Sequence, residues 1–395
     1  MGPNFNIGGY EKFAAFIQTH ASLQFIHLQS TDYTSTVGVR TLTLRHFQSL
    51  VDIGLPLINR DPGRPAGQCF LLPDFNTVHL YLDHTREHAV VFCYFGNATP
   101  LREELGLSFR VGFELEFSAV QLDVTNPNQK AEVHASSGLR AIESFMLPLL
   151  SDITRRLELV ANVPVEQFHC GGSDNAYELV LGHLPPLEAV DGLVTAKETT
   201  RRVCRENGVQ VLFNPAPPEI NGLHTNISIQ GDGVEKVEES FLAGVIEHLG
   251  ALCAFAMPRP ESYARIKAGQ WKRGSGCWEI RLPDASAQMY LFMAGVLAAG
   301  MEGVRRGLEL RVKDCQVDVA MLTDEERLEL GVTEQLPTQP GQAFQLLLND
   351  ELLMGSIGEE LLTMYVTIQE LYNKKLDEAG PEGSEPRKAW LMARI

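Results

Sequence analysis

The sequence lacks several features that would assign its class directly. No run of 18 or more apolar residues occurs, so we expect no transmembrane helix. The first residues carry no basic segment followed by an apolar one, and we expect no secretory signal. Neither a GxxxxGK[S/T] phosphate loop nor a GxGxxG dinucleotide fingerprint is present. The expectation is a cytoplasmic protein that does not bind nucleotides through either motif.

Positive charge and paired cysteines are scarce as well. The 33 Lys and Arg residues are outnumbered by 50 Asp and Glu, which gives a net charge of −17. Such a surface disfavours nucleic acid and anionic membranes as partners, and leaves a small molecule as the expected one. The 7 cysteines are dispersed and form no CxxC pair, as expected of reduced thiols. Part of the surplus of carboxylates is available to a metal site.

Length and patterning predict the domain organisation. A chain of 395 residues is expected to form two or three domains. Short strands and helices in residues 1–97 predict a small α+β domain, and residues 98–377 predict a second, larger one. Residues 378–395 are rich in glycine, proline and charge, and predict a mobile end. Long helices are predicted in the larger domain at residues 136–160, 185–208, 241–256, 285–307 and 350–377.

The stretch 109–117 alternates apolar and polar residues and predicts a strand with one apolar face. Its other face carries Glu114 and Glu116, whose Cα atoms would lie roughly 7 Å apart. Like charges on one face repel each other, and a divalent cation above them would relieve that repulsion. The alternative is a solvated face with two unrelated glutamates, and this strand taken alone favours that alternative.

Three later strands repeat the pattern of an apolar back and a polar front. Their polar residues are Glu178, then His224, Asn226 and Ser228, and finally Glu279 and Arg281. Carboxylates with a single histidine suit Mg²⁺ or Mn²⁺ better than a structural zinc. A lone histidine on a strand is more often a polar residue without a ligand role. Here the glutamates fall on the polar faces of their strands as His224 does, so a metal site and a polar residue without such a role are equal alternatives. Ser173 or Cys170 near His169 is weak evidence for a nucleophile.

These residues lie in ordered motifs that resemble the glutamine synthetase superfamily, in its fungal-type glutamine-synthetase-like branch. The resemblance implies an N-terminal β-grasp domain over 1–97, followed by a catalytic domain over 98–377 with a curved antiparallel sheet flanked by helices. It also implies a homo-oligomer, in this family a ring with active sites between neighbouring subunits. The family's motifs PDxsT, GxExEF, VEQfH, GQfEl, LPPLeAvD, NGxHxH, SYkR and ExRxPD resemble, in order, residues 73–77, 111–117, 165–169, 175–179, 184–191, 221–226, 262–265 and 279–284.

The resemblance also implies a cofactor set and its ligands. Family members join ammonia or an amine to the γ-carboxyl group of glutamate, using ATP and two or three Mg²⁺ or Mn²⁺ ions. One ion would lie on Glu114, His224 and Glu279. A second would lie on Glu116, Glu178 and a glutamate two residues after His169. The remaining cofactor-binding positions that the resemblance assigns are Glu166, Asn226 and Ser228.

The chain departs from the family in several places. Gly171 stands where the second metal site has its third ligand, and Asn226 replaces the second histidine of NGxHxH. The family's extended segment with its phosphate-binding arginines is reduced to residues 266–278, whose basic residues are Lys267, Lys272 and Arg273. Phosphoryl transfer depends on such cations, so use of ATP is in doubt. Asp61 is a candidate for the family's ammonium-binding aspartate.

Three functional hypotheses follow. The first is a repurposed enzyme of specialised metabolism with one metal as Lewis acid, which isomerises, cyclises or adds to a small carbonyl or carboxylate substrate. In it, Arg281 and Arg265 would hold a carboxylate or oxyanion, while His169, Glu116 and Glu178 would move protons. The second is an ATP-dependent ligase of the glutamate–ammonia type. The third is a non-catalytic scaffold.

Overall fold

The structure is a computed structural model of the chain. It describes residues 9–52, 57–60, 68–81, 87–94, 107–121, 145–171, 175–213, 215, 221–231, 234–265, 271–274, 277–313, 322–332 and 335–394. Two sheets and two apolar cores organise these residues. The boundary predicted between residues 97 and 98 lies outside the described ranges.

The N-terminal sheet has the strand order β2-β1-β6-β4-β3, and β5 pairs with β6. β1 runs antiparallel to β2 and parallel to β6. Three rings of its core, Phe13, Phe47 and Phe75, pack against one another with centroids 4.8 to 6.0 Å apart. The elements are α1 (Tyr10–Thr19), β1 (Phe25–Thr31), β2 (Val37–Thr43), α2 (Leu44–Asp52), β3 (Leu57–Arg60), β4 (Gln68–Pro73), β5 (His79–Leu80) and β6 (His88–Tyr94).

The second sheet has the order β12-β13-β11-β7-β9-β8, with β10 also paired to β7. All of its pairs are antiparallel, and β7 is its longest strand with 14 residues. In the described part of the chain β12 and β8 form its two ends, so the sheet is open. Its strands are β7 (Ser108–Gln121), β8 (Val165–Cys170), β9 (Ala176–Leu181), β10 (Val209–Leu212), β11 (Leu223–Gln230), β12 (Trp271–Gly274) and β13 (Cys277–Ile280).

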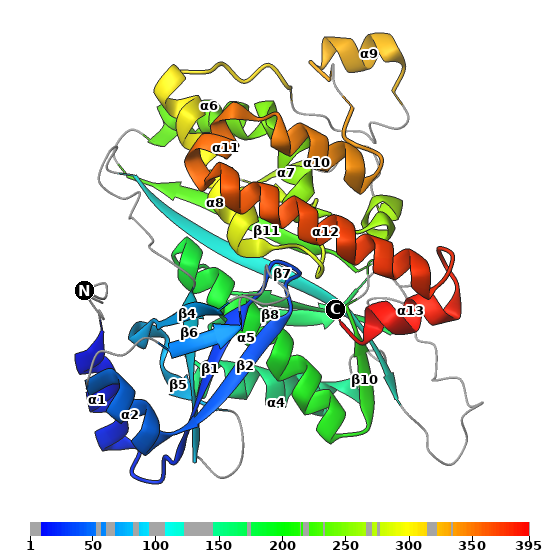
Figure 1. Cartoon of the computed structure of the whole chain (residues 1–395). Helices are drawn as coiled ribbons and strands as arrows, with labels where there is room; N and C mark the ends of the chain where they lie inside the picture. Colours follow the sequence, from blue (N-terminus) through cyan, green and yellow to red (C-terminus); the bar gives the residue numbers. More distant parts are fainter. Residues whose placement is uncertain are drawn as a thin grey trace.

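Helices cover this sheet through one large apolar core. Figure 1 shows α6 to α8 and α10 to α12 on one side of the long β7 strand, and α4 and α5 on the other. The helices are α4 (Met146–Leu159), α5 (Pro186–Glu206), α6 (Val234–Glu247), α7 (Leu249–Ala256), α8 (Met289–Arg306), α9 (Asp324–Glu329), α10 (Pro340–Leu348), α11 (Glu351–Ile357), α12 (Glu359–Ala379) and α13 (Glu385–Met392). Over the described ranges no single helix could cross a membrane, and only the bent pair α6–α7 has the length and composition to do so.

Two helices predicted as continuous are broken in the structure. The segment 241–256 lies in α6 and α7, which meet at 72°, and His248 at the bend pairs with Asp350 at 2.7 Å. The segment 350–377 divides into α11 and α12 at Gly358, whose φ of 116° is one that residues with a side chain rarely adopt. Apolar periodicity continues through both breaks, and for that reason the sequence pattern did not reveal them.

The C-terminal end differs from the mobile segment that its composition predicted. Residues Glu385–Met392 form α13, in which Arg387 is only 2% exposed. The Arg387 guanidinium donates to Glu261 Oε1 at 2.5 Å and to Asp377 Oδ1 at 2.7 Å, and Leu391 is buried. A buried ion pair between residues so far apart in sequence holds this end in place, and composition cannot show such a pair.

Candidate active site

The strand register builds one polar surface from four strands. Glu114 on β7 is paired with His224 on β11, and Glu116 on β7 is paired with Glu178 on β9. Asn226 on β11 is in turn paired with Glu279 on β13. Directly paired residues project from the same face of a sheet. The polar positions that alternation singled out in each strand therefore meet on a common face.

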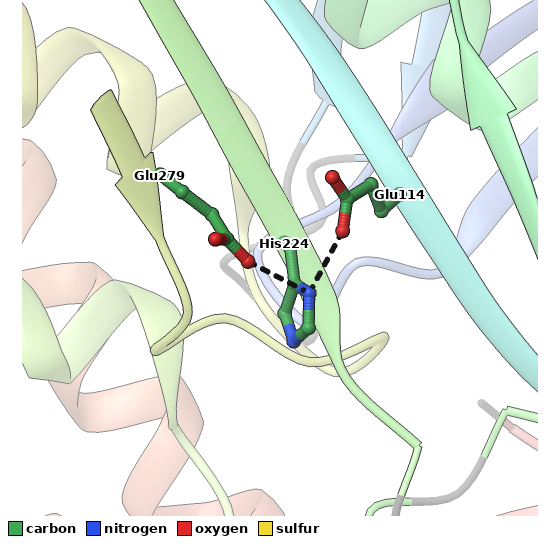
Figure 2. Close-up of side chains that lie close together, drawn as sticks. All are labelled: Glu114, His224 and Glu279. Carbon is green, nitrogen blue, oxygen red and sulfur yellow. Dashed lines mark hydrogen bonds and ion pairs between the residues drawn. The ribbon is translucent and has the colours of Figure 1, made fainter. Parts of the chain in front are cut away.

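Three of these residues form a compact group of potential metal ligands. The imidazole of His224 is 7% exposed, and its Nδ1 lies 3.0 Å from Glu114 Oε2 and 3.2 Å from Glu279 Oε1. Figure 2 shows the two carboxylates pointing at the imidazole from the flanking strands. One ligand atom from each residue lies within 4.8 Å of the others. Two carboxylate oxygens and one imidazole nitrogen form a donor set that suits Mg²⁺ or Mn²⁺.

Strong electrostatic coupling joins these side chains. The hydrogen bond from His224 lowers the pKa of Glu114 to about 2 against the effect of burial, with help from Asn226 Nδ2, which donates to Glu114 Oε1 at 2.9 Å. Burial lowers the pKa of His224, but the hydrogen bonds to Glu114 and Glu279 and the charge of Glu116 outweigh it and raise that pKa to about 9. The carboxylates around His224 thus favour a positive charge at this position.

A second group of acidic residues adjoins the first. Glu116 Oε2 accepts from the backbone N–H of Gly222 at 2.5 Å, and its Oε1 lies 3.5 Å from His224 Nε2. Burial, together with the charge of Glu114, raises the pKa of Glu178 to about 7, and His169 opposes that rise from 3.7 Å away. Glu178 can therefore gain or lose a proton near neutral pH.

Two glycines shape this surface. A Cβ atom at Gly222 would lie 2.8 Å from Arg265 Nη2 and 3.1 Å from His224 Nε2, so any larger residue here would displace these side chains. A Cβ atom at Gly171 would lie 3.0 Å from the Cβ of Ala176, whose carbonyl accepts from the Gly171 N–H at 2.7 Å. Position 171, where the resemblance implies a third ligand, is thus closely packed against the neighbouring strand β9.

The two arginines assigned to anion binding differ in their surroundings. The side chain of Arg281 is 43% exposed, and its Nε lies 3.4 Å from both Glu279 Oε1 and His224 Nε2. The side chain of Arg265 is largely buried and donates to the carbonyls of Leu282 at 3.0 Å and Arg281 at 3.3 Å. Arg281 lies at the exposed edge of the polar face and is available to a ligand. Arg265 instead stabilises the backbone directly after β13.

The other predicted positions lie around this centre or outside it. Glu166 pairs with His183, with Nδ1 and Oε1 3.3 Å apart, and the His183 ring lies over Gly112 on β7. His183 was not predicted, because it follows a strand in an apolar context and no motif includes it. Ser228 pairs with Arg110 in the strand register, beyond the ligand group. Asp61, Ser173 and Lys267 lie outside the described residues, and only the backbone of Lys272 and Arg273 is described, in β12.

Comparison with known proteins identifies the family. The family described as "Glutamine synthetase, catalytic domain" matches residues 97–278 and 271–379. The two matched stretches overlap at residues 271–278. This overlap lies in the segment between residues 265 and 279, which is shorter than the corresponding segment of the family. Protein fluG of Emericella nidulans is 29% identical over 96% of this chain and 50% of its own length, so the chain spans half of that relative. The gamma-glutamylpolyamine synthetase of Streptomyces coelicolor is 26% identical over 70% of this chain and 66% of its own. A glutamine synthetase of Clostridium saccharobutylicum is 26% identical over 67% of each chain.

Solved structures share the fold. Apo GmaS superposes with a TM-score of 0.77 over 95% of this chain and 98% of its own, at 19% identity. A structure described as a novel glutamine synthase homolog gives a TM-score of 0.70 over 94% and 99%, at 23% identity. These likenesses confirm the predicted fold class. Since the family match also covers most of the sequence, the chain belongs to the glutamine synthetase family.

Proposed function

We propose that this protein is a metal-dependent enzyme that binds one Mg²⁺ or Mn²⁺ ion and acts on a small molecule with a carboxylate or carbonyl group. The observation that carries the proposal is one complete donor set, Glu114, His224 and Glu279, beside an incomplete one. The second set keeps Glu116 and Glu178 but has Gly171 at its third position. A single firmly held ion is therefore expected in each chain.

The residues of the polar face have separable roles in this proposal. A metal ion bound there supplies Lewis-acid polarisation of a carbonyl or carboxyl oxygen. Asn226 orients Glu114 through its amide, and Arg281 at the rim offers charged N–H donors to a substrate carboxylate or a developing oxyanion. Glu178, with its pKa raised to about 7, and neighbouring His169 are placed to take a proton from the substrate and return it elsewhere.

The reaction class follows from what the chain has lost. Phosphoryl transfer requires cations around the γ-phosphate, and here both a metal ligand and the family's arginine segment are missing. Proton transfer next to a polarised carbonyl needs neither. We therefore favour isomerisation, cyclisation or addition over ATP-driven ligation, and place it in specialised metabolism.

Ligation is the second candidate, favoured by the relatives themselves. Those at 26% identity include a glutamine synthetase and a gamma-glutamylpolyamine synthetase, both named for ligation. In this reading, ATP would activate a glutamate-like carboxylate, and ammonia or an amine would displace phosphate to form the amide. Both candidates share three further proposals: domain limits of 1–97 and 98–377, a cytoplasmic location and a ring-shaped homo-oligomer. The start of the family match at residue 97 supports the first of them.

Two measurements separate the candidates. In the first, Mn²⁺ is titrated calorimetrically into the wild type, His224→Ala, Glu279→Gln and the exposed control Arg155→Gln. We expect one tight ion in the wild type and the control, and a loss of affinity of at least roughly tenfold in the other two. Unchanged binding in His224→Ala would refute the metal assignment.

The second measurement tests ligation. The protein is incubated with ATP, Mg²⁺, glutamate and hydroxylamine, and ADP and the hydroxamate are quantified. We expect no ADP above a His224→Ala control. Steady turnover that this variant abolishes would refute the favoured reaction class and establish the ligase.

A further inference from the structure

A cavity of about 330 Å³ lies on the side of β11 away from the metal ligands. Leu223 lines it, while the next residue, His224, faces the polar surface. Its walls come from the β1–β2 hairpin, from α5, from residues 285–290 before and at the start of α8, and from the last residues after α13. In Figure 1 the C-terminal end of the chain lies close to this hairpin. No residue of the proposed metal site belongs to it.

The walls are fixed by hydrogen bonds between distant parts of the chain. Ser35 Oγ at the tip of the hairpin donates to the carbonyl of Ala287 at 2.7 Å. In return, Gln288 Nε2 donates to the carbonyl of Asp32 at 2.8 Å. The hairpin and the segment before α8 therefore form one continuous wall, and the cavity does not depend on a loose loop.

Cations predominate among the charged groups that line the cavity. Lys197, Arg201 and Arg394 face a single carboxylate, Glu198, which is already paired with Arg201. Lys197 Nζ donates to the carbonyl of Ala285 at 2.8 Å, and no carboxylate in the described part of the chain lies within ion-pair distance of it. An ammonium group has three N–H donors, so two are left for a ligand.

Within the described ranges, Arg394 is held in place without a carboxylate. Its guanidinium stacks on the ring of Trp390 at 4.0 Å and donates to the carbonyl of that residue at 3.1 Å. Hydroxyl and amide groups of Thr31, Ser286 and Gln288 complete the lining. The cavity thus combines neutral hydrogen-bonding groups with two cations that form no ion pair among the residues that the structure describes.

We propose that this cavity binds a small organic anion that carries one or two carboxylate groups, held by Lys197 and Arg394. A volume of 330 Å³ equals that of about ten water molecules, which suits a metabolite of similar atom count. The proposal does not rest on the function of the polar face, because no side chain is shared between them. A ligand here would contact Leu223, next to the metal-ligand histidine, and would be in a position to regulate it.

The pH dependence of binding has a defined sign. Burial and the nearby charge of Arg201 lower the pKa of Lys197 to about 7, against the smaller opposing effects of Glu198 and Asp284. The cation of Arg394 also lines the cavity. A bound carboxylate favours the charged ammonium, so above pH 7 binding is accompanied by proton uptake. Affinity should fall as pH rises above 7, by at most about tenfold per pH unit.

Succinate is the probe, since both of its carboxyl groups are largely ionised throughout the range tested. It is titrated calorimetrically into the full chain between pH 6.5 and 8.5, and inorganic phosphate is titrated in parallel to distinguish a carboxylate site from a general anion site. We expect saturable binding of one succinate per chain. Lys197→Met and Arg394→Gln should each weaken it by roughly tenfold or more. Lys197→Arg should keep binding and lose the pH dependence.

Controls locate the site. Arg155→Gln removes an exposed cation of α4 and should not change succinate binding. Arg281→Gln removes the cation of the polar face, so it distinguishes binding at that face from binding in the cavity. Arg394 is exposed and lies after α13, so its variant is expected to fold even if a change at Lys197 unfolds the protein. The proposal is overturned if the wild type binds succinate no more tightly than it binds phosphate, if Arg394→Gln binds succinate as the wild type does, or if only Arg281→Gln abolishes binding.

Discussion

The proposed second metal site keeps Glu116 and Glu178 but has Gly171 in place of a third ligand. Adding a carboxylate at position 171 is the sharpest test of this departure from the family. The change is Gly171→Glu, combined with Ala176→Gly. Alone, a side chain at position 171 would press its Cβ against that of Ala176 at 3.0 Å. Overpacking of this kind costs about 1–3 kcal/mol. Removing the Ala176 methyl relieves the contact, at a cost of about 0.5–1 kcal/mol for a glycine inside a strand.

Charge adds to the packing cost as long as no ion is bound. The new carboxylate would join Glu116 and Glu178, and the pKa of Glu178 is already raised to about 7 by burial and by neighbouring carboxylates. The double variant should therefore be less stable than the wild type in the presence of EDTA. A bound ion at 100 times its dissociation constant stabilises the folded state by about 2.7 kcal/mol, which offsets most of that loss.

The assay combines Mn²⁺ calorimetry with thermal unfolding in Mn²⁺ and in EDTA. We expect one ion per chain in the wild type and in Ala176→Gly, and two in the double variant, with a larger Mn²⁺-induced rise in melting temperature. Two equally tight ions in the wild type would refute the idea of a damaged second set. A double variant that folds in EDTA yet still binds one ion would refute the placement of residue 171 as its third ligand.

Three other changes test the surroundings of the site. Gly222→Ala should lower Mn²⁺ affinity by roughly 10–100-fold in calorimetry, since its methyl group would press on Arg265 and His224. Arg387→Met should lower the free energy of unfolding in urea by about 3–5 kcal/mol, because the buried carboxylate of Glu261 loses its partner, and a further Glu261→Gln change should recover part of it. Burial raises the pKa of Asp191 to about 7 in spite of a hydrogen bond from Tyr290, so the folded state keeps a proton that the unfolded state loses near pH 4. Stability should fall as pH rises from 4 to 7, by at most about 4 kcal/mol, and Asp191→Asn should remove this dependence while matching the wild type at pH 4.

Strand alternation was enough to predict which side chains share the polar face. The period of two is a local property, so Glu114, Glu178 and Glu279 could be assigned to a common side of their strands from the residues alone. The order of the strands is not local. That Glu114 and His224 share a site was implied only by the resemblance to a known family. That β7 lies between β11 and β9 is a finding of the structure. The structure then gives the closeness of the ligand atoms, which neither argument contained.

The sequence could not show which groups surround each residue of the site. Arg265 has the chemistry of an anion binder, but its guanidinium is engaged by the carbonyls of residues 281 and 282, and the path of the backbone there decides this. Gly171 appeared in the sequence only as a departure from the family's ligand set, with no sign that it adjoins Ala176. In the structure they contact each other across β8 and β9, so they form a single feature. One substitution cannot undo it, which is why the restoring variant needs two.

The same long-range packing connects the C-terminal helix to the metal ligands. Arg387 on α13 holds Glu261, which lies in the 3-10 turn Pro260–Arg265. Arg265 at the end of that turn holds the carbonyl groups directly after β13, the strand that carries Glu279. Each step in this series is a hydrogen bond from a largely buried guanidinium group, whose planar donors fix the orientation of their acceptors. The C-terminal helix, whose composition suggested a free tail, thus belongs to the framework that positions Glu279.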